Sequence, residues 1–574
     1  MPGRTPESKR TDDTARPNAL ATDRRGLLLS ISTSLLLGGT LTGCTSFLGR
    51  NGSPDENGVA KLLEAPEPPE LIREAAAPRG LNAIQITGVG LANSLPGTGG
   101  PADPSPYRDQ LIEEMRRNDV KSPNEILEQE SNAIVRVYAT IPPGAKRGDT
   151  VDLRIDSPAG SNATDLHGGW LLDTRLRLQQ VLQGRVRKGE LLAMGTGPIM
   201  PRAAFEGDAD KRMKTQGVVL AGGTVQKTRN MGLVLRPEFQ HVKVSSEIAA
   251  AINRRFFFFD GTTRRGVAKA VEDDYIELEL HPRYEGSLGR YITVVRSIAI
   301  NERQGNSQPR LQKLASMLSD PATASDAALQ LEALGESAIP TLIAGLKTDN
   351  PELRFYAAEA LAYLDRRDAI APLAAAIADE PAFRYPALAA LKGLEHPEVV
   401  DALMGLFQHP SIESRYGAFV TLRARNDSIL ALSPQKLGTA LQFYQIDSTA
   451  PAAIVVSTRE EPEVVVFGTP APVRVGGAIL GPNALIIKAE SSEPGKLRIS
   501  RFQVGRDDRR TTAPSTIDGL IQGIISIGGD YADVVEVLRE AKSKGYIDDQ
   551  LAIDPLPTAL RTYYRDDEPS DDES

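Results

Sequence analysis

The chain has 574 residues, which at ~150 residues per domain corresponds to about three or four domains. Hydrophobic residues make up 41% and charged residues 25% of it, as in ordinary globular proteins that bury a sizeable core. The formal net charge of −9 argues against a general nucleic-acid-binding protein, which usually needs a basic face. Cys44 is the only cysteine, so the chain forms no intrachain disulfide. The five histidines are scattered, and we expect no metal site and no cofactor.

The N-terminus is typical of an export signal. Residues 1–25 are polar, and an apolar run follows from Gly26 to Leu41. This run is shorter than the ~20 apolar residues of a membrane-spanning helix, but it fits the apolar part of a signal peptide. Arg24 and Arg25 directly precede it and are similar to a twin-arginine export signal. An ordinary secretory signal with two arginines explains the same residues, so the export route stays open.

The apolar run ends in Leu41, Thr42, Gly43 and Cys44, which resemble a bacterial lipobox. Small residues before the cysteine let a peptidase approach the backbone, and the Cys44 thiol takes a diacylglycerol through a thioether. Two acyl chains give stable membrane anchoring. The alternative is a short buried helix with a chance cysteine. We therefore predict a signal peptide over residues 1–43 and lipid attachment at Cys44. Residues 44–79 are rich in Gly, Pro and Glu and are expected to form a disordered tether.

Residues 80–306 have an α+β pattern. The glycines of Gly88–Leu91 and Gly97–Gly100 indicate turns, and no phosphate-loop spacing is present. A helix is predicted over Tyr107–Asn118, with Leu111, Ile112 and Met115 on one face. Strands are predicted over residues 133–141, 151–156, 190–197, 217–220, 234–239, 267–271 and 275–280, and a helix over 245–255. Four phenylalanines, residues 256–259, favour a strand that is buried on both faces or lies at an interface.

Residues 311–426 are rich in alanine and leucine and repeat internally. Leu331, Leu361, Leu391 and Leu422 follow one another at intervals of 30 or 31 residues. A fixed period of about 30 residues with two helices per unit is typical of an α-solenoid. The repeats are similar to short HEAT repeats. His396 and His409 each precede a proline in a turn, so neither is expected to bind a ligand.

Residues 434–562 return to a mixed pattern. Strands are predicted near 454–457, 464–467, 473–479 and 484–489, and helices over Ser515–Ile527 and Tyr531–Lys544. Residues 563–574 form an acidic tail that is expected to be disordered.

The first and third regions resemble the two ends of the flagellar P-ring protein family. The resemblance rests on fragments in matching order, namely ITGVGLANSLPGTGG (86–100), NAIVRVYATIPPGAKRGDTVDLRI (132–155), DLHGGWLLDTRL (165–176), GVVLAGGTVQKT (217–228), SSEIAAAINRRF (245–256) and the helix pair of 515–553. It implies an α+β fold in which P-ring-like, mixed β-rich domains are split by an inserted α-solenoid. The insertion and the lipobox both depart from the family's usual pattern.

The resemblance also implies a function. It points to a structural subunit that forms a ring with copies of itself around the flagellar rod, in the periplasm within the peptidoglycan layer, beside rod and outer-membrane ring proteins. The family offers no catalytic residues, and the sequence has no HExxH motif or nucleophile elbow, so we expect no enzyme. Glu272–Asp274 is interpreted as a solvated turn. The solenoid is interpreted as the surface of a lipoprotein adaptor for another protein, or as a lid without a partner.

Overall fold

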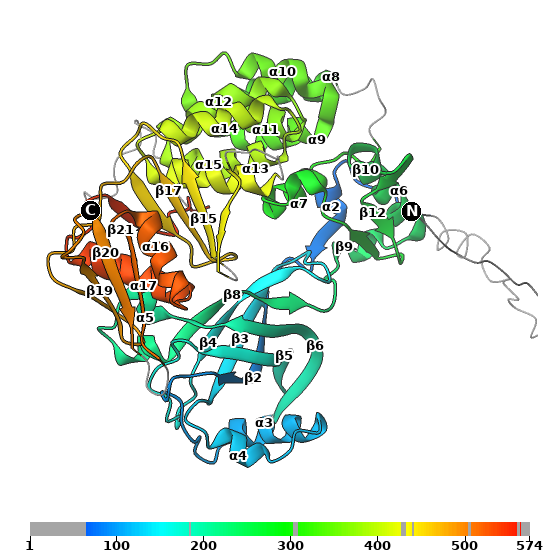
Figure 1. Ribbon diagram of the computed structural model, residues 1–574. Coiled ribbons are helices and arrows are strands. Elements are labelled where there is room, and N and C mark those ends of the chain that lie inside the picture. Colours follow the sequence, from blue (N-terminus) through cyan, green and yellow to red (C-terminus); the bar gives the residue numbers. More distant parts are fainter. Residues whose placement is uncertain are drawn as a thin grey trace, which may run out of the picture. The chain divides into compact units, whose positions relative to one another are not determined.

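The computed structural model describes residues 65–182, 185–301, 308–425, 432–438, 441–502, 507–559 and 563 (Figure 1). None of the helices within these ranges has the length and hydropathy that crossing a membrane requires. The predicted signal peptide, the lipobox, the first part of the tether and the acidic tail after residue 563 lie outside the described residues.

The folded part begins before residue 80, so the disordered tether predicted over residues 44–79 is too long at its C-terminal end. Residues 71–79 form helix α2 (Ile72–Ala75) and strand β1 (Ala76–Arg79). Ile72 and Ala75 are completely buried, and the backbone N–H of Ile72 donates to the carbonyl of Ile298 at 3.1 Å. The partners of these residues lie far along the chain, and local composition does not indicate them.

A seven-stranded antiparallel sheet follows, in the order β4-β3-β2-β5-β6-β8-β7. Strand β4 pairs with both β3 and β8, so the sheet closes on itself around its own core. Its strands are β2 (Ile84–Asn93), β3 (Ala133–Ile141), β4 (Thr150–Asp156), β5 (Trp170–Leu182), β6 (Arg185–Pro198), β7 (Met200–Pro201) and β8 (Gln216–Val225). The strands predicted over 133–141 and 151–156 are confirmed.

Short helices accompany this sheet. Helix α3 (Pro106–Arg117) begins at Ser105, whose hydroxyl accepts from the N–H of Arg108, and it packs Leu111, Ile112 and Met115 on β2. This confirms the predicted helix and its apolar face. Helices α4 (Pro123–Leu127) and α5 (Arg202–Glu206) complete the set.

The prediction that Gly88 and Gly90 mark turns is wrong, because both lie inside strand β2. A Cβ atom on Gly88 would lie 2.6 Å from the carbonyl oxygen of Arg175, and one on Gly90 would lie 2.3 Å from the hydroxyl of Thr174. These glycines therefore let β5 approach β2 closely, which is a packing role and not a turn.

Replacing Gly90 with alanine is expected to lower the free energy of unfolding by ~1–3 kcal/mol, because β5 must move to accept the methyl group. The matched control is Gly289→Ala in helix α7 (Leu288–Arg296), where a Cβ atom meets open space and alanine is expected to be neutral or stabilising by up to ~1 kcal/mol. Urea unfolding of both variants measures the difference. Equal midpoints would contradict the packing role.

A smaller sheet of order β1-β9-β13-β12 follows in sequence. It comprises β9 (Met231–Leu235), β12 (Ala268–Ala270) and β13 (Tyr275–Leu278), covered by α6 (Val242–Arg255) and followed by α7 (Leu288–Arg296). A separate hairpin joins β10 (Phe257–Asp260) to β11 (Thr263–Gly266). Strand β9 ends at Leu235 and not at Phe239, where the predicted strand ended. Phe256 is buried, but Phe259 is 66% exposed, so the phenylalanine run is not a strand buried on both faces.

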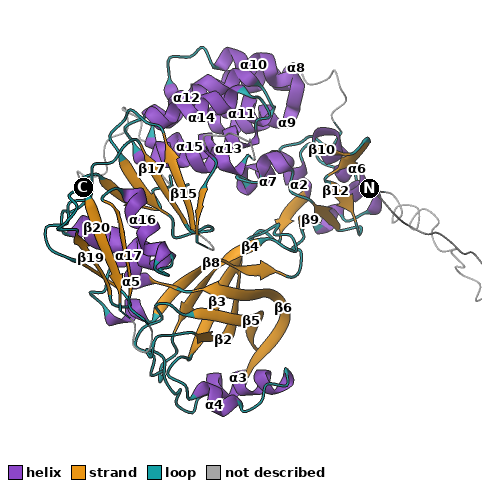
Figure 2. Cartoon of the chain, viewed as in Figure 1, coloured by secondary structure: helices purple, strands orange, loops and turns teal. Residues whose placement is uncertain are grey.

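Residues 308–425 form the predicted α-solenoid, and Figure 2 shows helices joined by loops over this stretch. The four periodic leucines, Leu331, Leu361, Leu391 and Leu422, are all completely buried, which explains their spacing. The helices are α8 (Gln308–Leu318), α9 (Ala324–Leu334), α10 (Ile339–Gly345), α11 (Pro351–Tyr363), α12 (Ile370–Asp379), α13 (Arg384–Gly393), α14 (Glu398–Gly405) and α15 (Ile412–Ala424).

The third region contains two sheets. The first has the order β14-β15-β17-β16-β22 and the second the order β18-β19-β20-β21. Their strands are β14 (Gln435–Leu437), β15 (Leu441–Ile446), β16 (Ala453–Val456), β17 (Glu463–Phe467), β18 (Ile479–Gly481), β19 (Leu485–Ala489), β20 (Lys496–Arg501), β21 (Arg509–Pro514) and β22 (Gln550–Ile553). The predicted strand 473–479 is wrong, because β18 begins only at Ile479. The backbone N–H groups of Val473 and Arg474 donate to the carbonyls of Ser515 and Tyr546, which lie in loops and not in a neighbouring strand.

The five-stranded sheet lies between two cores. Phe467 and Val465 of β17 pack in the core that includes the solenoid, whereas Val464 and Val466 pack with helices α16 (Ile517–Ser526) and α17 (Tyr531–Ser543). Every residue of β17 is buried, which accounts for the unbroken apolar run of residues 464–467. The insertion is consequently packed onto the third region along one face of this sheet.

Candidate functional site

Buried ionic clusters join the three regions, and they are the most elaborate polar sites in the described part of the chain. The first cluster joins the first region to the third. His167 lies in the loop before β5, where its backbone N–H donates to the carboxylate of Asp165 at 2.8 Å. Its Nε2 atom lies 2.9 Å from Oδ1 of Asp533 in α17. Arg501, from β20, places Nη2 3.2 Å from Oδ2 of the same carboxylate.

Local structure holds the acidic side of this cluster in place. Asp530 is the N-cap of α17 and forms a capping box with Asp533, in which each carboxylate accepts the other residue's backbone N–H at 2.9 and 3.0 Å. Glu536 lies one turn further along the helix, with Oε2 3.8 Å from Nδ1 of His167. His167 is 4% exposed and Asp533 is completely buried, so water screens this contact little.

The buried carboxylates determine the charge of His167. Burial alone lowers the pKa of this imidazole, but its hydrogen bond with Asp533 and the charges of Asp533, Asp530 and Glu536 outweigh that effect and raise the pKa to about 9. Burial likewise raises the pKa of Asp533, but His167 and Arg501 outweigh it and hold that pKa below its usual range. His167 is therefore a cation at neutral pH, and the two regions meet through a buried ion pair.

His167, Asp530 and Asp533 bring their ligand atoms within 4.8 Å of one another, which makes a metal ion worth testing against the geometry. A histidine ligand must be neutral, whereas this one is held protonated. Both oxygens of Asp533 are also engaged, one by His167 and the other by Arg501 and the N–H of Asp530. The donor set therefore fits an ion-pair network better than a metal site.

A second cluster attaches the solenoid to the first region. Arg290 of α7 lies between two glutamates of the solenoid and places guanidinium nitrogens 2.5 Å from Glu332 and 2.5 Å from Glu359. The hydroxyl of Tyr284 donates to Glu332 at 2.5 Å. Glu332 is completely buried, and burial raises the pKa of Glu359 even though Arg290 opposes that rise. The positive charge of Arg290 thus stabilises the negative charges of two buried carboxylates.

A third cluster attaches the other end of the solenoid to the third region. Glu463 begins β17, is 1% exposed, and accepts from the hydroxyl of Tyr416 in α15 at 2.9 Å. Arg423, which lies about two helix turns beyond Tyr416 in α15, forms an ion pair with the same carboxylate. Burial raises the pKa of Glu463 to about 7, although Arg423 and Tyr416 act in the opposite direction.

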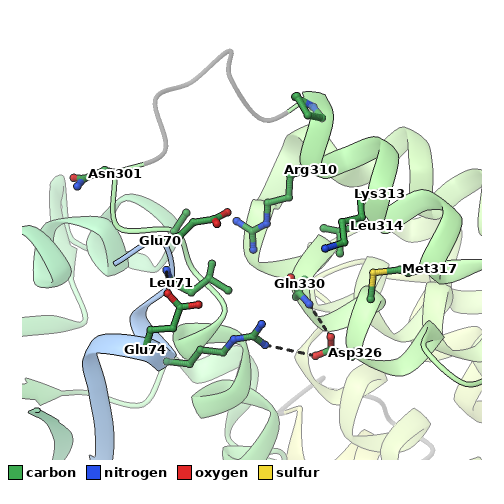
Figure 3. Close-up of a pocket in the computed structure, with 13 residues that line it drawn as sticks. Glu70, Leu71, Glu74, Asn301, Arg310, Lys313, Leu314, Met317, Asp326 and Gln330 are labelled. Carbon is green, nitrogen blue, oxygen red and sulfur yellow. Dashed lines mark hydrogen bonds and ion pairs between the residues drawn. The ribbon is translucent and has the colours of Figure 1, made fainter. Parts of the chain in front are cut away.

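A cavity of about 920 Å³ lies between the start of the folded chain and the solenoid (Figure 3). Glu70 and Glu74 line one side, and Arg310 and Lys313 of α8 line the other. Asp326 accepts from Gln330 at 2.7 Å and lies 4.0 Å from Arg73. The lining carries carboxylates and cations together, so it points to no ligand class.

The site residues predicted from the sequence do not belong to these clusters. Arg24, Arg25, Leu41, Thr42, Gly43 and Cys44 are all outside the described residues, so lipid attachment and export remain predictions. The three ionic clusters were not predicted from the sequence. Their only local signal is a charged residue within an apolar run, such as Glu332 and Glu359 in alanine-rich helices or Glu463 before three valines.

Two protein families match parts of the chain. Residues 71–308 match the family described as flagellar P-ring protein, and residues 308–392 match HEAT repeats. These matches confirm the predicted resemblance over the first region and the inserted repeats, and the third region lies outside both matches. The first match begins at residue 71, where the structure also places the start of the fold.

Individual relatives agree with the family match. The flagellar P-ring protein of Thermotoga maritima is 27% identical over 253 residues, which cover 41% of this chain and 71% of the relative. That of Thiobacillus denitrificans is 32% identical over 172 residues, or 30% of this chain and 46% of the relative. A solved complex of CpcE and CpcF of phycocyanin lyase from Nostoc sp. matches 21% of this chain and 79% of its own at 26% identity, with a TM-score of 0.17.

Proposed function

We propose that this chain is a structural subunit of a flagellar basal-body P ring, built by copies of the chain around the rod in the periplasm. The observation that carries the proposal is the match of residues 71–308 to P-ring proteins. A ring requires a heterologous interface that closes, and it requires no cofactor pocket. Rod proteins, outer-membrane ring proteins and nearby peptidoglycan are the surroundings that such a subunit would meet.

The buried clusters support one body built from the first and third regions. His167 and Asp533 are 366 residues apart in sequence, yet they share a buried ion pair. The inserted solenoid therefore leaves the first and third regions in direct contact. On this view the third region also belongs to the ring subunit, although it lies beyond the matched residues.

The proposal includes a lipid anchor. Cys44 of the lipobox would carry the diacylglycerol, and the residues that follow it would tether the folded part to a membrane. Mass spectrometry of the purified protein tests this directly, since lipidation removes residues 1–43 and adds acyl chains at Cys44. A mature protein that begins elsewhere would contradict it.

The alternative function is an envelope lipoprotein adaptor that binds a protein partner through its repeats. The match of residues 308–392 to HEAT repeats favours this alternative, because solenoids present extended binding surfaces. Here the P-ring-like fold would act as a scaffold outside the flagellum.

Quantitative mass spectrometry of purified hook–basal bodies from the source organism separates the two functions. We expect the chain at ring-like stoichiometry relative to rod proteins, and we expect basal bodies of a deletion strain to lack the ring. The Cys44→Ser strain is the matched comparison, since it removes the anchor and leaves the fold. Intact basal bodies without this chain would exclude the P-ring role and leave the adaptor.

A further inference from the structure

A cleft of about 490 Å³ lies between the closed sheet and the small sheet. Its lining includes five basic residues, Lys146, Arg147, Arg229, Arg265 and Lys269, and two acidic residues, Glu277 and Glu279. Lys146 and Arg147 come from the loop between β3 and β4, whereas Lys269 and Arg265 come from β12 and β11. The cleft thus gathers positive charge in a protein that is acidic as a whole.

Both carboxylates of the cleft are already engaged. Glu279 accepts from Arg265 at 2.8 Å, and Glu277 accepts from the amide of Asn230. Arg229 donates to two backbone carbonyls, those of Ile141 at 2.9 Å and Asn82 at 2.8 Å.

Three cations remain for a ligand. Lys146, Arg147 and Lys269 are exposed, and within the described ranges none of their side chains forms an ion pair with a carboxylate. The backbone N–H of Lys146 donates to the carboxylate of Asp149 at 2.8 Å. The backbone N–H of Arg147 donates to Thr228 at 3.1 Å, which holds the loop against the wall of the cleft. Three unpaired cations on a held framework attract an anion such as a phosphate group.

The hairpin β10–β11 leads directly out of this cleft. Arg265 and Gly266 of β11 line the cleft, and the same strand pairs Arg264 with Phe259. Phe259 is 66% exposed, and the guanidinium of Arg264 lies 3.8 Å from the ring centroid of Phe257. Exposed aromatic rings beside arginines are typical of segments that lie at the boundary between headgroups and acyl chains.

The chain enters the fold at the same sheet. Strand β1, which follows the tether, pairs with β9, and β9 belongs to the sheet that contains β12 and Lys269. Only about 20 residues separate Cys44 from residue 65, a span of at most ~70 Å when fully extended. An anchor at Cys44 would therefore limit the distance between residue 65 and the membrane to that span.

We propose that the cleft and the hairpin together bind an anionic phospholipid surface, with headgroup phosphates in the cleft and Phe259 at the acyl boundary. The surface gives the anchored subunit a fixed orientation on the membrane. The choice of a membrane as the partner rests on the lipid anchor in the proposed function, whereas the binding surface itself does not involve Cys44.

Vesicle flotation of the chain without residues 1–64 tests the proposal. Residues 65–574 form a compact unit of their own, so this shortened chain keeps every described element. We expect flotation with vesicles of phosphatidylcholine and phosphatidylglycerol, weakened by salt, and little with phosphatidylcholine alone. The combined variant Lys146→Glu, Arg147→Glu and Lys269→Glu should lower the binding constant by at least about a hundredfold, because losing each cation alone weakens binding about fivefold. Phe259→Ser should lower it about tenfold.

The matched control reverses three exposed lysines elsewhere, Lys211→Glu, Lys436→Glu and Lys488→Glu, which change the net charge equally. Equal loss in the control and the cleft variant would overturn the proposal, as would equal binding to both kinds of vesicle. Binding to peptidoglycan sacculi but not to vesicles, or stabilisation by inorganic phosphate alone, would also overturn it. Because the assay contains neither Cys44 nor flagellar proteins, its failure leaves the P-ring proposal untouched.

Discussion

Replacing His167 with glutamine is expected to lower the free energy of unfolding by ~3 kcal/mol below about pH 6.5. Glutamine keeps a hydrogen-bond donor of similar reach for Asp533 but removes the positive charge, so the change isolates the ion pair. The loss follows from the difference between a folded pKa of about 9 and an ordinary histidine pKa of ~6.5 in the unfolded chain. Chemical denaturation of both proteins over a pH series measures it.

The sign of the pH dependence follows from the raised pKa. The folded state binds the His167 proton more tightly than the unfolded state does, so this contribution is complete below ~pH 6.5 and is lost as the pH rises through about 9. The gap between the protein and the His167→Gln variant should therefore close on the alkaline side. His241→Gln is the control, since that half-buried imidazole accepts from the backbone N–H of Lys243 at 3.0 Å and forms no ion pair with a carboxylate among the described residues. A gap that stays constant with pH would show that the charge of His167 contributes nothing.

The solenoid could be predicted from sequence because its signal is local and periodic. Leu331, Leu361, Leu391 and Leu422 recur at a nearly fixed interval, and each fills the same kind of buried position in its repeat. Caps strengthen the pattern, as where Asn350 precedes Pro351 and accepts from the N–H groups of Glu352 and Leu353. Nothing outside one repeat and its neighbour is needed to see the pattern.

The ionic clusters could not be predicted because their partners meet only after folding. His167 looks like a loop residue, and Asp533 looks like an ordinary exposed position in the first turn of a helix. Their contact depends on the first and third regions coming together across the whole insertion. Similarly, Gly88 and Gly90 resemble turn residues in sequence, and only the approach of Thr174 from β5 reveals why side chains are excluded there.

Replacing Arg290 with methionine is expected to lower the free energy of unfolding by ~3–5 kcal/mol, because it leaves Glu332 and Glu359 buried without their cation. Methionine fills a similar volume, so the loss reflects charge and not a cavity. Arg366→Met is the control, since Arg366 is 44% exposed in its pair with Asp368 and exposed pairs contribute ~0–1 kcal/mol. Hydrogen exchange should locate the change in α8–α11, where the solenoid attaches.

Two further measurements distinguish lost charge compensation from simple misfolding. Without Arg290, burial acts unopposed on the Glu359 carboxyl, so its pKa rises further and the variant should lose stability as the pH rises from ~4. Adding Glu332→Gln and Glu359→Gln should recover most of the loss, because neutral residues remove the need for a buried cation. A combined variant as unstable as Arg290→Met alone would mean that Arg290 acts by packing, for instance through its guanidinium 4.8 Å from the ring centroid of Tyr363. Recovery would instead identify the cluster as an electrostatic attachment of the solenoid to the first region.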